Sequence, residues 1–333
     1  MSHGVAIVGC GLIGRKRAAA LNRAHLVVCA DVDIDRAQQL AGTVPDAAAS
    51  ASWQTAVARP DVEIVIVATT NDALTPVAQG ALEAGKHVLV EKPAGRSSAE
   101  IAALIDAARR AGRRVRVGFN HRYHPALRKA RELVDEGAVG PLMFVRARYG
   151  HGGRLGYERE WRANPKVSGG GELIDQGVHV IDLARWFLGD FASVDGVATT
   201  YFWKMPVDDN AFMTLRTREG QTAFLHVSCT EWKNMFSMEI YGQDGKLAID
   251  GLGGSYGLER LTWYRMLPQM GPPETTNWEF PGADESWKVE FDEFVDDIHL
   301  ERDPSAGLGD ALAALHVVEA IYQRSGYDFV PNT

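Results

Sequence analysis

The chain is poor in cysteine and has no long apolar run. Its three cysteines, Cys10, Cys29 and Cys229, are widely separated and show neither zinc-ligand spacing nor a disulfide framework, so we expect reduced core thiols. No apolar run approaches the roughly 20 residues that cross a bilayer. The N-terminus enters a strand-like run without the basic and then apolar leader of a secretory signal. These absences predict a cytoplasmic protein with no membrane contact.

The chain also lacks an excess of positive charge. Its 35 Lys and Arg residues are outnumbered by 43 Asp and Glu residues, which gives a formal net charge of −8. Binding to nucleic-acid phosphates normally needs a basic face, so we expect no nucleic-acid partner. The 333 residues are enough for two domains, each with its own core. We expect a dinucleotide-binding domain over residues 1–120 and a substrate-binding and oligomerisation domain over 121–333, with the C-terminal helix a candidate to pack back on the first domain.

A glycine pattern near the N-terminus indicates nucleotide binding. Gly9, Gly11 and Gly14 follow the apolar run Val5–Val8 and open the helix-like stretch Leu12–Asn22. In the dinucleotide fingerprint the first glycine permits a tight turn, the second lets the backbone approach the pyrophosphate, and the third lets helix and strand pack closely. The N-terminus of the helix favours the phosphate charge.

An acidic residue indicates which dinucleotide binds. The second apolar run, Leu26–Ala30, ends at Asp31, about 20 residues beyond the glycines. A carboxylate there can accept hydrogen bonds from the adenosine ribose and would repel a 2′-phosphate. NAD is therefore favoured over NADP, although Arg36 lies nearby and leaves NADP open.

The order of apolar runs predicts the fold class. Up to about residue 120, strand-like runs alternate with helical patterns, which is typical of a doubly wound parallel sheet. The runs are Val5–Val8, Leu26–Ala30, Ile64–Ala68, His87–Val90 and Arg114–Gly118, and the helices include Asp72–Ala84 and Ser98–Ala111. From about Leu142 longer alternating strands predict a large, mostly antiparallel open sheet with one face covered. These strands are Met143–Tyr149, Val194–Tyr201, Ala211–Thr217, Thr222–Thr230, Ser237–Tyr241 and Leu258–Tyr264, and two helices follow, Trp287–His299 and Ala311–Arg324. The prediction is an α/β protein with an N-terminal Rossmann domain and a C-terminal α/β domain.

Two further motifs carry candidate catalytic groups. Lys92 lies in Glu91–Pro93 at the end of a predicted parallel strand, where open α/β sheets bind their ligands. Gly169–Gly171 precede a predicted helix in which Asp175 and His179 fall four residues apart, with Asp182 on the same face. Three glycines weaken a helix start unless a close approach is needed, which favours a functional interpretation of this segment.

With these motifs in hand, the chain resembles the Gfo/Idh/MocA family of sugar and polyol oxidoreductases over nearly its whole length. The motifs that carry the resemblance are Val5–Gly14, Ala84–Val88, Glu91–Pro93, Val117–Asn120 and the Asp-x-x-x-His helix after the triple glycine. The resemblance implies that Lys92 lies near the reacting hydroxyl, that Asp175 positions substrate and that His179 is the acid/base. It also implies a cis peptide at Lys92–Pro93 and a homodimer or homotetramer formed through the C-terminal sheet. The cofactor-binding residues expected are Gly9, Gly11, Leu12, Ile13, Gly14, Asp31, Thr69, Thr70, Asn71, Glu91 and Lys92.

Elementary chemistry agrees with these roles. Oxidation of a secondary alcohol removes a hydride and the hydroxyl proton, and a histidine that titrates near neutrality suits the second task. The Lys92 ammonium can stabilise alkoxide charge or, if its pKa is lowered, share the proton transfer. Which of Lys92 and His179 is the principal base stays open. No metal is expected, because hydride transfer to NAD needs none and no third ligand is evident.

The substrate is less well defined by the sequence. Residues Arg146–Lys166 hold several arginines and aromatics, which either face an anionic group such as a sugar phosphate or form a solvated strand face. The substrate-binding residues expected are Asn120, Arg122, Tyr157, Trp161, Arg162, Asp175 and His179, with Arg122 and His124 alternatively interdomain contacts. The sequence thus predicts an NAD-dependent oxidoreductase that moves a hydride between nicotinamide and a secondary hydroxyl or keto group of a small carbohydrate, phosphorylated or nucleotide-linked sugars included. The alternatives are an inositol dehydrogenase and a non-catalytic, NAD-sensing regulator.

Overall fold

The computed structural model describes residues 3–328, which divide into two compact units. The first unit comprises residues 3–119, 167–169 and 287–312 of the described chain. The second comprises residues 120–166, 170–286 and 313–328. The later part of the chain therefore contributes two segments to the first unit.

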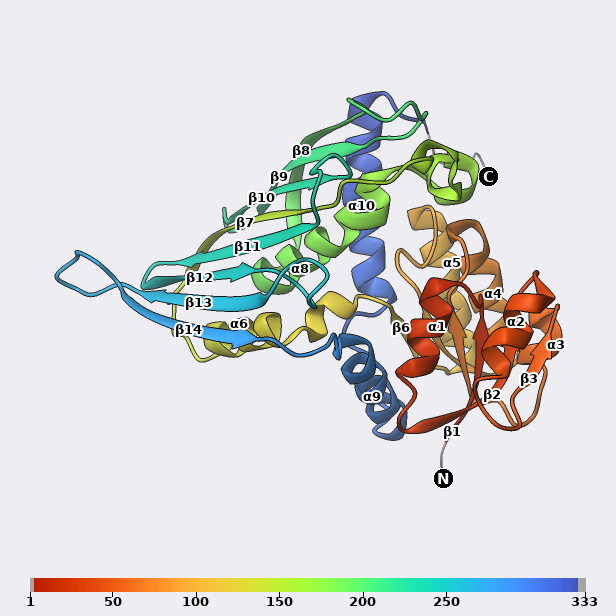
Figure 1. The fold of residues 1–333 in the computed structure, drawn as a ribbon. Coiled ribbons are helices and arrows are strands. Elements are labelled where there is room, and N and C mark those ends of the chain that lie inside the picture. Colours follow the sequence, from red (N-terminus) through yellow and green to blue (C-terminus); the bar gives the residue numbers. More distant parts are fainter. Residues whose placement is uncertain (1–2, 329–333) are drawn as a thin grey trace. The chain divides into compact units, whose positions relative to one another are not determined.

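The first unit contains a six-stranded parallel sheet. Its strands are β1 (His3–Val8), β2 (Ala24–Ala30), β3 (Ala48–Ser50), β4 (Ile64–Val67), β5 (His87–Val90) and β6 (Val115–Val117), in the order β3-β2-β1-β4-β5-β6. Every residue of β1 and β4 is buried, as expected for parallel strands covered on both faces. The order changes direction between β1 and β4, and ligands bind beside such a point in open α/β sheets. The predicted doubly wound Rossmann sheet is confirmed (Figure 1).

Helices with recognisable starts connect these strands. They are α1 (Leu12–Ala19), α2 (Ile34–Ala41), α3 (Trp53–Val57), α4 (Asn71–Glu83) and α5 (Ser98–Ala111). Asp33, Ser52 and Ser97 cap α2, α3 and α5, each accepting a hydrogen bond from a backbone N–H of the first turn. A further helix, α9 (Ser286–His299), packs Phe291 and Phe294 into the same core as β1. α9 is the helix that the sequence predicts over Trp287–His299.

The second unit contains an eight-stranded sheet. Its strands are β7 (Leu142–Gly150), β8 (Phe191–Thr199), β9 (Asn210–Thr217), β10 (Thr222–Ser228), β11 (Met235–Gly242), β12 (Gly245–Asp250), β13 (Glu259–Arg265) and β14 (Glu274–Phe280). They follow the order β14-β13-β12-β11-β7-β10-β9-β8. All neighbours pair antiparallel except β7 and β10, which are parallel. The mostly antiparallel sheet is confirmed, with this one parallel pair in its middle.

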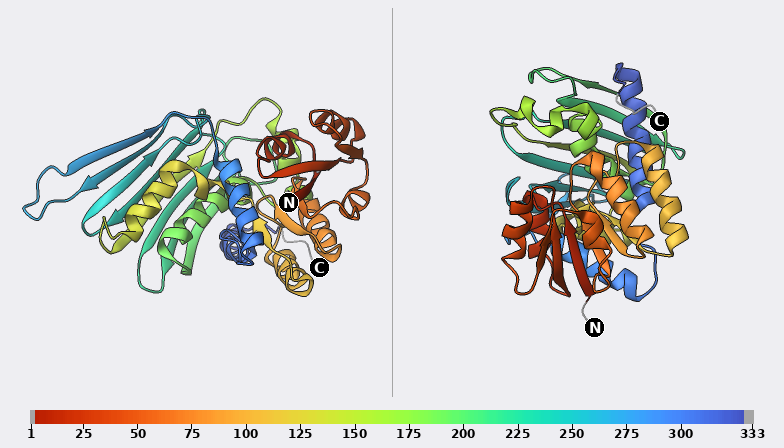
Figure 2. Two further views of the ribbon diagram at one scale, coloured as in Figure 1. Left: turned by 90° about the horizontal axis from the view of Figure 1, so that it is seen from below. Right: turned by 90° about the vertical axis from the view of Figure 1, so that its right-hand side faces the viewer.

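Helices cover one face of this sheet. The helical segments in this part of the chain are η1 (Asn120–Tyr123), α6 (Pro125–Asp135), η2 (Tyr157–Arg159), η3 (Trp161–Ala163), α7 (Pro165–Ser168), η4 (Leu173–Gly177), α8 (Val178–Leu188) and α10 (Leu308–Ser325). α6 and α8 lie along the sheet in Figure 1 and in the left view of Figure 2. Burial alternates strictly along β11, as it does in a strand with one covered face.

Three further observations concern the cysteines, membrane-spanning helices and metal ligands. Cys10, Cys29 and Cys229 are buried free thiols. Among residues 3–328, no helix is both long and apolar enough to cross a bilayer. The same described residues contain no group of three or more His, Cys, Asp or Glu side chains placed to hold a metal ion.

Candidate active site

The fingerprint glycines adopt the conformations that their predicted roles require. Gly9 has φ +94°, and a Cβ atom there would lie 2.4 Å from the carbonyl oxygen of Ala68. A Cβ atom on Gly14 would lie 1.9 Å from the carbonyl oxygen of Gly9, so helix α1 can approach the turn only with glycine at this position. Gly11, the N-cap of α1, faces open space. A ligand can therefore come directly against the backbone at Gly11.

The start of α1 suits a negatively charged group. The helix begins at Leu12, has no acidic residue in its first turn and has no side-chain cap. Its first N–H groups and the positive end of its dipole are therefore directed at whatever lies beyond Gly11. Leu12 and Ile13 form this first turn, and Leu12 is 65% exposed. The residues present thus fit the pyrophosphate of a dinucleotide.

Asp31 is fixed beside this turn at the end of β2. One carboxylate oxygen, Oδ2, accepts the N–H of Cys10 at 2.7 Å, and the other, Oδ1, accepts the N–H of Asp33 at 2.9 Å. Each oxygen keeps a further lone pair for the ribose hydroxyls of a bound dinucleotide. The carboxylate that the sequence predicts to select NAD is therefore hydrogen-bonded to the backbone of Cys10, which lies between the first two fingerprint glycines.

We predict that Asp31→Ala weakens binding of NADH by roughly 10- to 100-fold, because each hydrogen bond to a charged group contributes about 1.5–3 kcal/mol. Binding of NADPH should change less, because the variant also loses the repulsion of the 2′-phosphate. Titration of cofactor fluorescence with both dinucleotides measures the two changes. Asp33→Asn, which keeps the cap of α2 and removes a neighbouring charge, is the matched control. A wild type that prefers NADPH would refute the role of Asp31.

The other cofactor residues predicted in this unit follow β4 and β5. Thr70 caps α4, and its hydroxyl donates to Asp72 at 2.6 Å. The Asn71 amide donates to the carbonyl oxygen of Ser168 at 2.8 Å, so Asn71 also anchors a later segment within the same unit. Thr69 and Asn71 thus lie at the carboxyl end of β4, beside the switch point of the sheet.

The Lys92 turn follows β5, and its Lys92–Pro93 peptide is cis, as the resemblance implies. The residue before it, Glu91, is buried and accepts the Nε–H of Arg17 at 2.6 Å. The Arg17 Nη1 group donates to Glu290 at 2.5 Å, and the Arg17 guanidinium lies 4.5 Å from the centroid of the Trp287 ring. Burial lowers the pKa of Arg17. The charges of Glu290 and Glu91 raise this pKa, and the net shift is upward. One buried guanidinium thus holds the carboxylate next to Lys92.

The triple glycine in the second unit makes close backbone contacts around a buried carboxylate. A Cβ atom on Gly170 would lie 2.2 Å from the Tyr322 hydroxyl, and one on Gly171 would lie 2.0 Å from the carbonyl oxygen of Asp208. The Asp208 carboxylate accepts the N–H groups of Gly171 and Leu173 and the Tyr322 hydroxyl at 2.7–2.9 Å. Burial raises the pKa of Asp208 to about 6, although these donors lower it. Asp208 therefore anchors the segment that leads to Asp175.

The helix after the glycines differs from the prediction. Leu173–Gly177 form one turn of π-helix, and only from Val178 does the segment continue as the regular helix α8. The i, i+4 and i+7 argument assumes 3.6 residues per turn, and a π-turn is wider. The spacing argument therefore does not by itself place Asp175 on the same face as His179 and Asp182, and π-turns are often found at functional sites.

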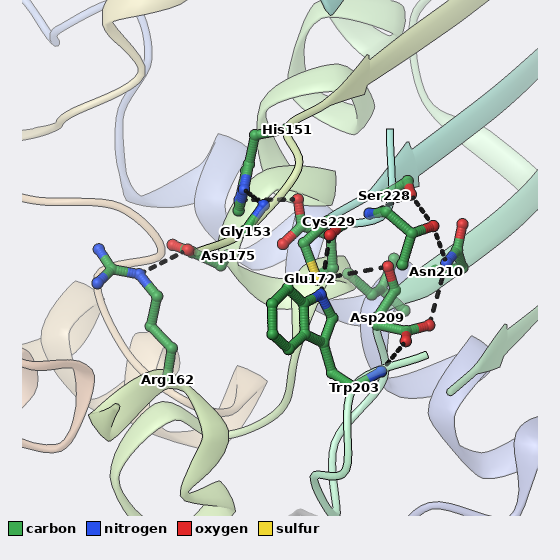
Figure 3. A network of polar contacts seen from close by, with 12 residues as sticks. His151, Gly153, Arg162, Glu172, Asp175, Trp203, Asp209, Asn210, Ser228 and Cys229 are labelled. Atoms are coloured by element: carbon green, nitrogen blue, oxygen red, sulfur yellow. Dashed lines mark hydrogen bonds and ion pairs between the residues drawn. The ribbon is translucent and has the colours of Figure 1, made fainter. Parts of the chain in front are cut away.

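Asp175, His179 and Asp182 each contact a different side chain. Asp175 accepts the Arg162 Nε–H at 2.9 Å (Figure 3), and the charge of Asp175 is the main cause of the raised pKa of Arg162. The buried His179 ring lies edge-on to His121, with ring centroids 3.8 Å apart. Asp182 forms a bidentate ion pair with Arg122 at 2.8 and 2.5 Å.

The predicted substrate residues are therefore used in different ways. Arg162 meets Asp175, as a shared site requires. Arg122 is buried against Asp182 within the second unit, a contact that neither prediction for Arg122 included. The Asn120 amide donates to the Ser286 hydroxyl at 2.9 Å, and His124 pairs with Glu259 at 3.0 Å. Tyr157 is buried, whereas Trp161 is half-buried with the Arg162 guanidinium 4.5 Å from its ring centroid.

Sequence reasoning missed two histidines near this region. His121 contacts the His179 ring and follows Asn120, so its place beside two candidates was a usable signal. His151 faces the buried Glu172, with Nε2 3.6 Å from the carboxylate (Figure 3), and its Nδ1 accepts the N–H of Gly153 at 2.9 Å. Burial lowers the pKa of His151, and Glu172 raises it by more. No motif spacing indicated this pair.

Comparison with known families and proteins adds to this geometry. The NAD-binding Rossmann fold of the GFO/IDH/MocA oxidoreductase family matches residues 3–119, and the GFO/IDH/MocA C-terminal domain matches residues 127–248. A levoglucosan dehydrogenase of Pseudarthrobacter phenanthrenivorans is 29% identical over 65% of this chain and 60% of the relative. An inositol 2-dehydrogenase of Gluconacetobacter diazotrophicus is 31% identical over 58% of this chain and 57% of the relative. The matches thus span about three fifths of these two relatives.

The fold is similar to that of solved structures over almost the whole chain. A levoglucosan dehydrogenase in complex with NADH and levoglucosan superposes with a TM-score of 0.87 at 23% identity and covers 98% of this chain and 97% of that one. At this identity the likeness shows the fold alone. The two family matches, the glycine turn and Asp31 together make the first unit an NAD-binding Rossmann domain. The chain belongs to the GFO/IDH/MocA family of oxidoreductases.

Proposed function

We propose that the protein is an NAD-dependent oxidoreductase that transfers a hydride between nicotinamide and a secondary hydroxyl or keto group of a neutral sugar or cyclic polyol. The observation that carries the proposal is the Asp175–Arg162 pair beside the helix of His179, in a chain whose other unit binds NAD. Relatives named levoglucosan dehydrogenase, inositol 2-dehydrogenase and 1,5-anhydro-D-fructose reductase support this substrate class.

The chain's own residues supply the proton chemistry. Bound NAD⁺ provides the hydride acceptor. In the proposal, His179 accepts the hydroxyl proton, as imidazole can near neutral pH. Asp175, oriented by Arg162, accepts a hydrogen bond from a neighbouring substrate hydroxyl. Lys92, on the turn held by Glu91, stabilises the alkoxide as hydride leaves or shares the proton transfer.

The charge balance around the second unit's arginines favours a neutral substrate. Arg154 pairs with Glu160 at 2.6 Å, and Arg162 pairs with Asp175 at 2.9 Å. Arg146 pairs with Glu239 at 2.5 Å. Each of these three guanidinium groups already faces a carboxylate, whereas Arg148 on β7 is exposed. The three pairs support the interpretation of the arginine-rich stretch that has no anionic ligand.

NADH formation across matched pairs of sugars tests the function. We expect turnover of neutral sugars, 1,5-anhydro sugars or inositols, with the phosphorylated form of each sugar a poorer substrate. The KM should change by less than about twofold between low salt and about 1 M salt, where the Debye length falls to about 3 Å. Arg154→Ala should leave the KM for the neutral sugar near its wild-type value. Preference for the phosphorylated form, or a KM that rises steeply with salt, would refute the neutral-substrate proposal.

Two alternative functions, the oligomeric state and the cellular location are also proposals. An inositol dehydrogenase is the specific alternative, since several relatives carry that name. A non-catalytic NAD-sensing regulator is disfavoured because Lys92, Asp175 and His179 are all present. A homodimer or homotetramer through the open sheet is supported by the exposed apolar side chains Met143, Val197 and Phe224 on its strands. The cytoplasmic location stays a prediction from the sequence.

A further inference from the structure

Two exposed aromatic side chains pack together in the second unit. Phe202 and Trp232 are 55% and 64% exposed, and their rings meet edge to face with centroids 4.7 Å apart. Tyr201, beside Phe202 in the chain, is 71% exposed. Lys204 and Lys233 flank the pair in the sequence and are also exposed. Phe202 and Trp232, called the aromatic platform below, thus form a small apolar surface with a polar rim.

A buried carboxylate fixes one side of the platform. Asp209 is fully buried and accepts three consecutive backbone N–H groups, those of Tyr201, Phe202 and Trp203, at 2.9, 2.8 and 3.0 Å. The Trp203 indole N–H donates to the carbonyl oxygen of Cys229 at 2.9 Å (Figure 3). The Asp209 carboxylate thus holds the backbone of the turn that presents Phe202 to solvent.

Trp232 has an unusual backbone for so large a residue. Its φ is +57°, in the left-handed region that bulky side chains rarely occupy. A Cβ atom on Gly152 would lie 3.0 Å from the Trp232 Cα, so the backbone of Trp232 packs closely against the loop that holds Gly152. Strain of this kind is concentrated at ligand-binding sites.

A continuous series of ring contacts joins the platform to the candidate substrate residues. Phe202 meets Trp203 with centroids 5.2 Å apart, Trp203 meets Tyr157 at 5.4 Å, and Tyr157 meets His151 at 5.6 Å. Burial and then the charges of Glu172 and Asp175 raise the pKa of Tyr157 far above its ordinary value. Tyr157 therefore lies within the field of the carboxylate to which Arg162 donates.

We propose that the aromatic platform binds a second sugar ring, so that the substrate is a two-ring neutral carbohydrate such as a disaccharide or another glycoside. The inner residues Asp175 and Arg162 offer charged hydrogen bonds to the hydroxyls of the reacting ring. The platform offers aromatic surface to the C–H face of the next ring and no charged group. The inference rests on the proposed oxidation of neutral sugars.

The size of the platform distinguishes this occupant from a second copy of the chain. A stable protein interface takes about 20–30 residues on each side. The platform has two residues, Phe202 and Trp232, with their ring centroids 4.7 Å apart, far fewer than such an interface takes. Their connection to Tyr157 also points to the substrate, since a subunit contact needs no link to that residue.

The test compares sugars of one and two rings. We would measure kcat/KM for NAD⁺ reduction with cellobiose and maltose against glucose, and with lactose against galactose. Trp232→Ala and Phe202→Ala should each lower the ratio of the disaccharide to the monosaccharide value by roughly 3- to 10-fold, the effect of one aromatic contact. Leu300→Ala, which removes an apolar side chain of similar exposure from the first unit, should keep the wild-type ratio. Calorimetric titration of the NADH complex with the same sugars gives a readout that needs no turnover.

The outcomes separate the two proposals. If no sugar of either size reduces NAD⁺, the proposed oxidation is wrong, and the titrations alone decide whether the platform binds disaccharides. The platform proposal is overturned if wild type prefers the single-ring sugars in both measurements. It is also overturned if the two platform variants keep the wild-type ratio, or if Trp232→Ala changes the oligomeric state, which would show that a second copy covers the surface.

Discussion

Replacement of Lys92 or His179 by alanine should lower kcat by roughly 10²–10⁴, the range for a positioned acid or base. His179 is buried beside His121, and Lys92 follows the anchored Glu91. If both serve the same proton-transfer step, the double variant should lose less than the product of the two single losses. Single-turnover NADH formation measures the chemical step without product release.

Cofactor binding provides the control for this experiment. NADH affinity should stay close to wild type in His179→Ala, because the pyrophosphate and ribose contacts expected at Gly11 and Asp31 are intact. Arg122→Lys is the matched variant for His179→Ala. It alters the ion pair of Arg122 with Asp182, which lies on the same helix as His179, and it leaves the proposed base unchanged. A near-wild-type rate of NADH formation in His179→Ala would contradict the catalytic role of His179 and leave its helix with a structural role.

The second large effect is expected at Arg17. Arg17→Leu would leave Glu91 and Glu290 buried without their cation, and breaking a buried ion pair typically costs 3–5 kcal/mol of unfolding free energy. Urea denaturation without cofactor measures this loss. Arg36→Ala, which removes an exposed i, i+3 pair with Asp33, should change stability by no more than about 0.5 kcal/mol. A loss below about 1 kcal/mol in Arg17→Leu would contradict the buried-charge account.

The pH dependence of this variant has a definite sign. Burial, followed by the charge of Glu91, already raises the pKa of Glu290 although Arg17 lowers it. Without Arg17 the pKa of Glu290 rises further, so the folded state binds a proton that the unfolded state releases. A carboxyl group with a raised folded pKa contributes stability below its unfolded value and loses it as pH rises through the folded value. The deficit of Arg17→Leu should therefore shrink as pH falls toward the ordinary pKa of 4.5.

The sequence was most informative where one element needs one kind of residue. Uninterrupted apolar runs predicted β1 and β4, and glycine spacing predicted the turn before α1, because those backbones admit few alternatives. β14 was missed because its residues are mostly exposed and show no alternation. The return of α9 to the first unit depends on Phe291 and Phe294 meeting distant strands, which no local pattern encodes.

The sequence predicted which residues form the candidate site better than it predicted which residues they contact. Lys92, Asp175 and His179 were identified from motifs, whereas the π-turn under Asp175 depends on Asp208, which is 33 residues away in the chain and has no motif. Arg122 was predicted to be a substrate ligand or an interdomain contact, but its partner Asp182 is visible only in the fold. Tertiary ion pairs of this kind cannot be derived from spacing.

Direct hydride transfer is the central claim, and deuterium transfer tests it most directly. The protein would be mixed with NAD⁺ and fully carbon-deuterated glucose, inositol or cellobiose, and the reduced cofactor would be analysed by NMR. We predict one deuteron at C4 of the nicotinamide, with the transfer slowed in His179→Ala. Reduced cofactor without deuterium, or no reduction with any neutral sugar or polyol while NADH still binds, would contradict the account.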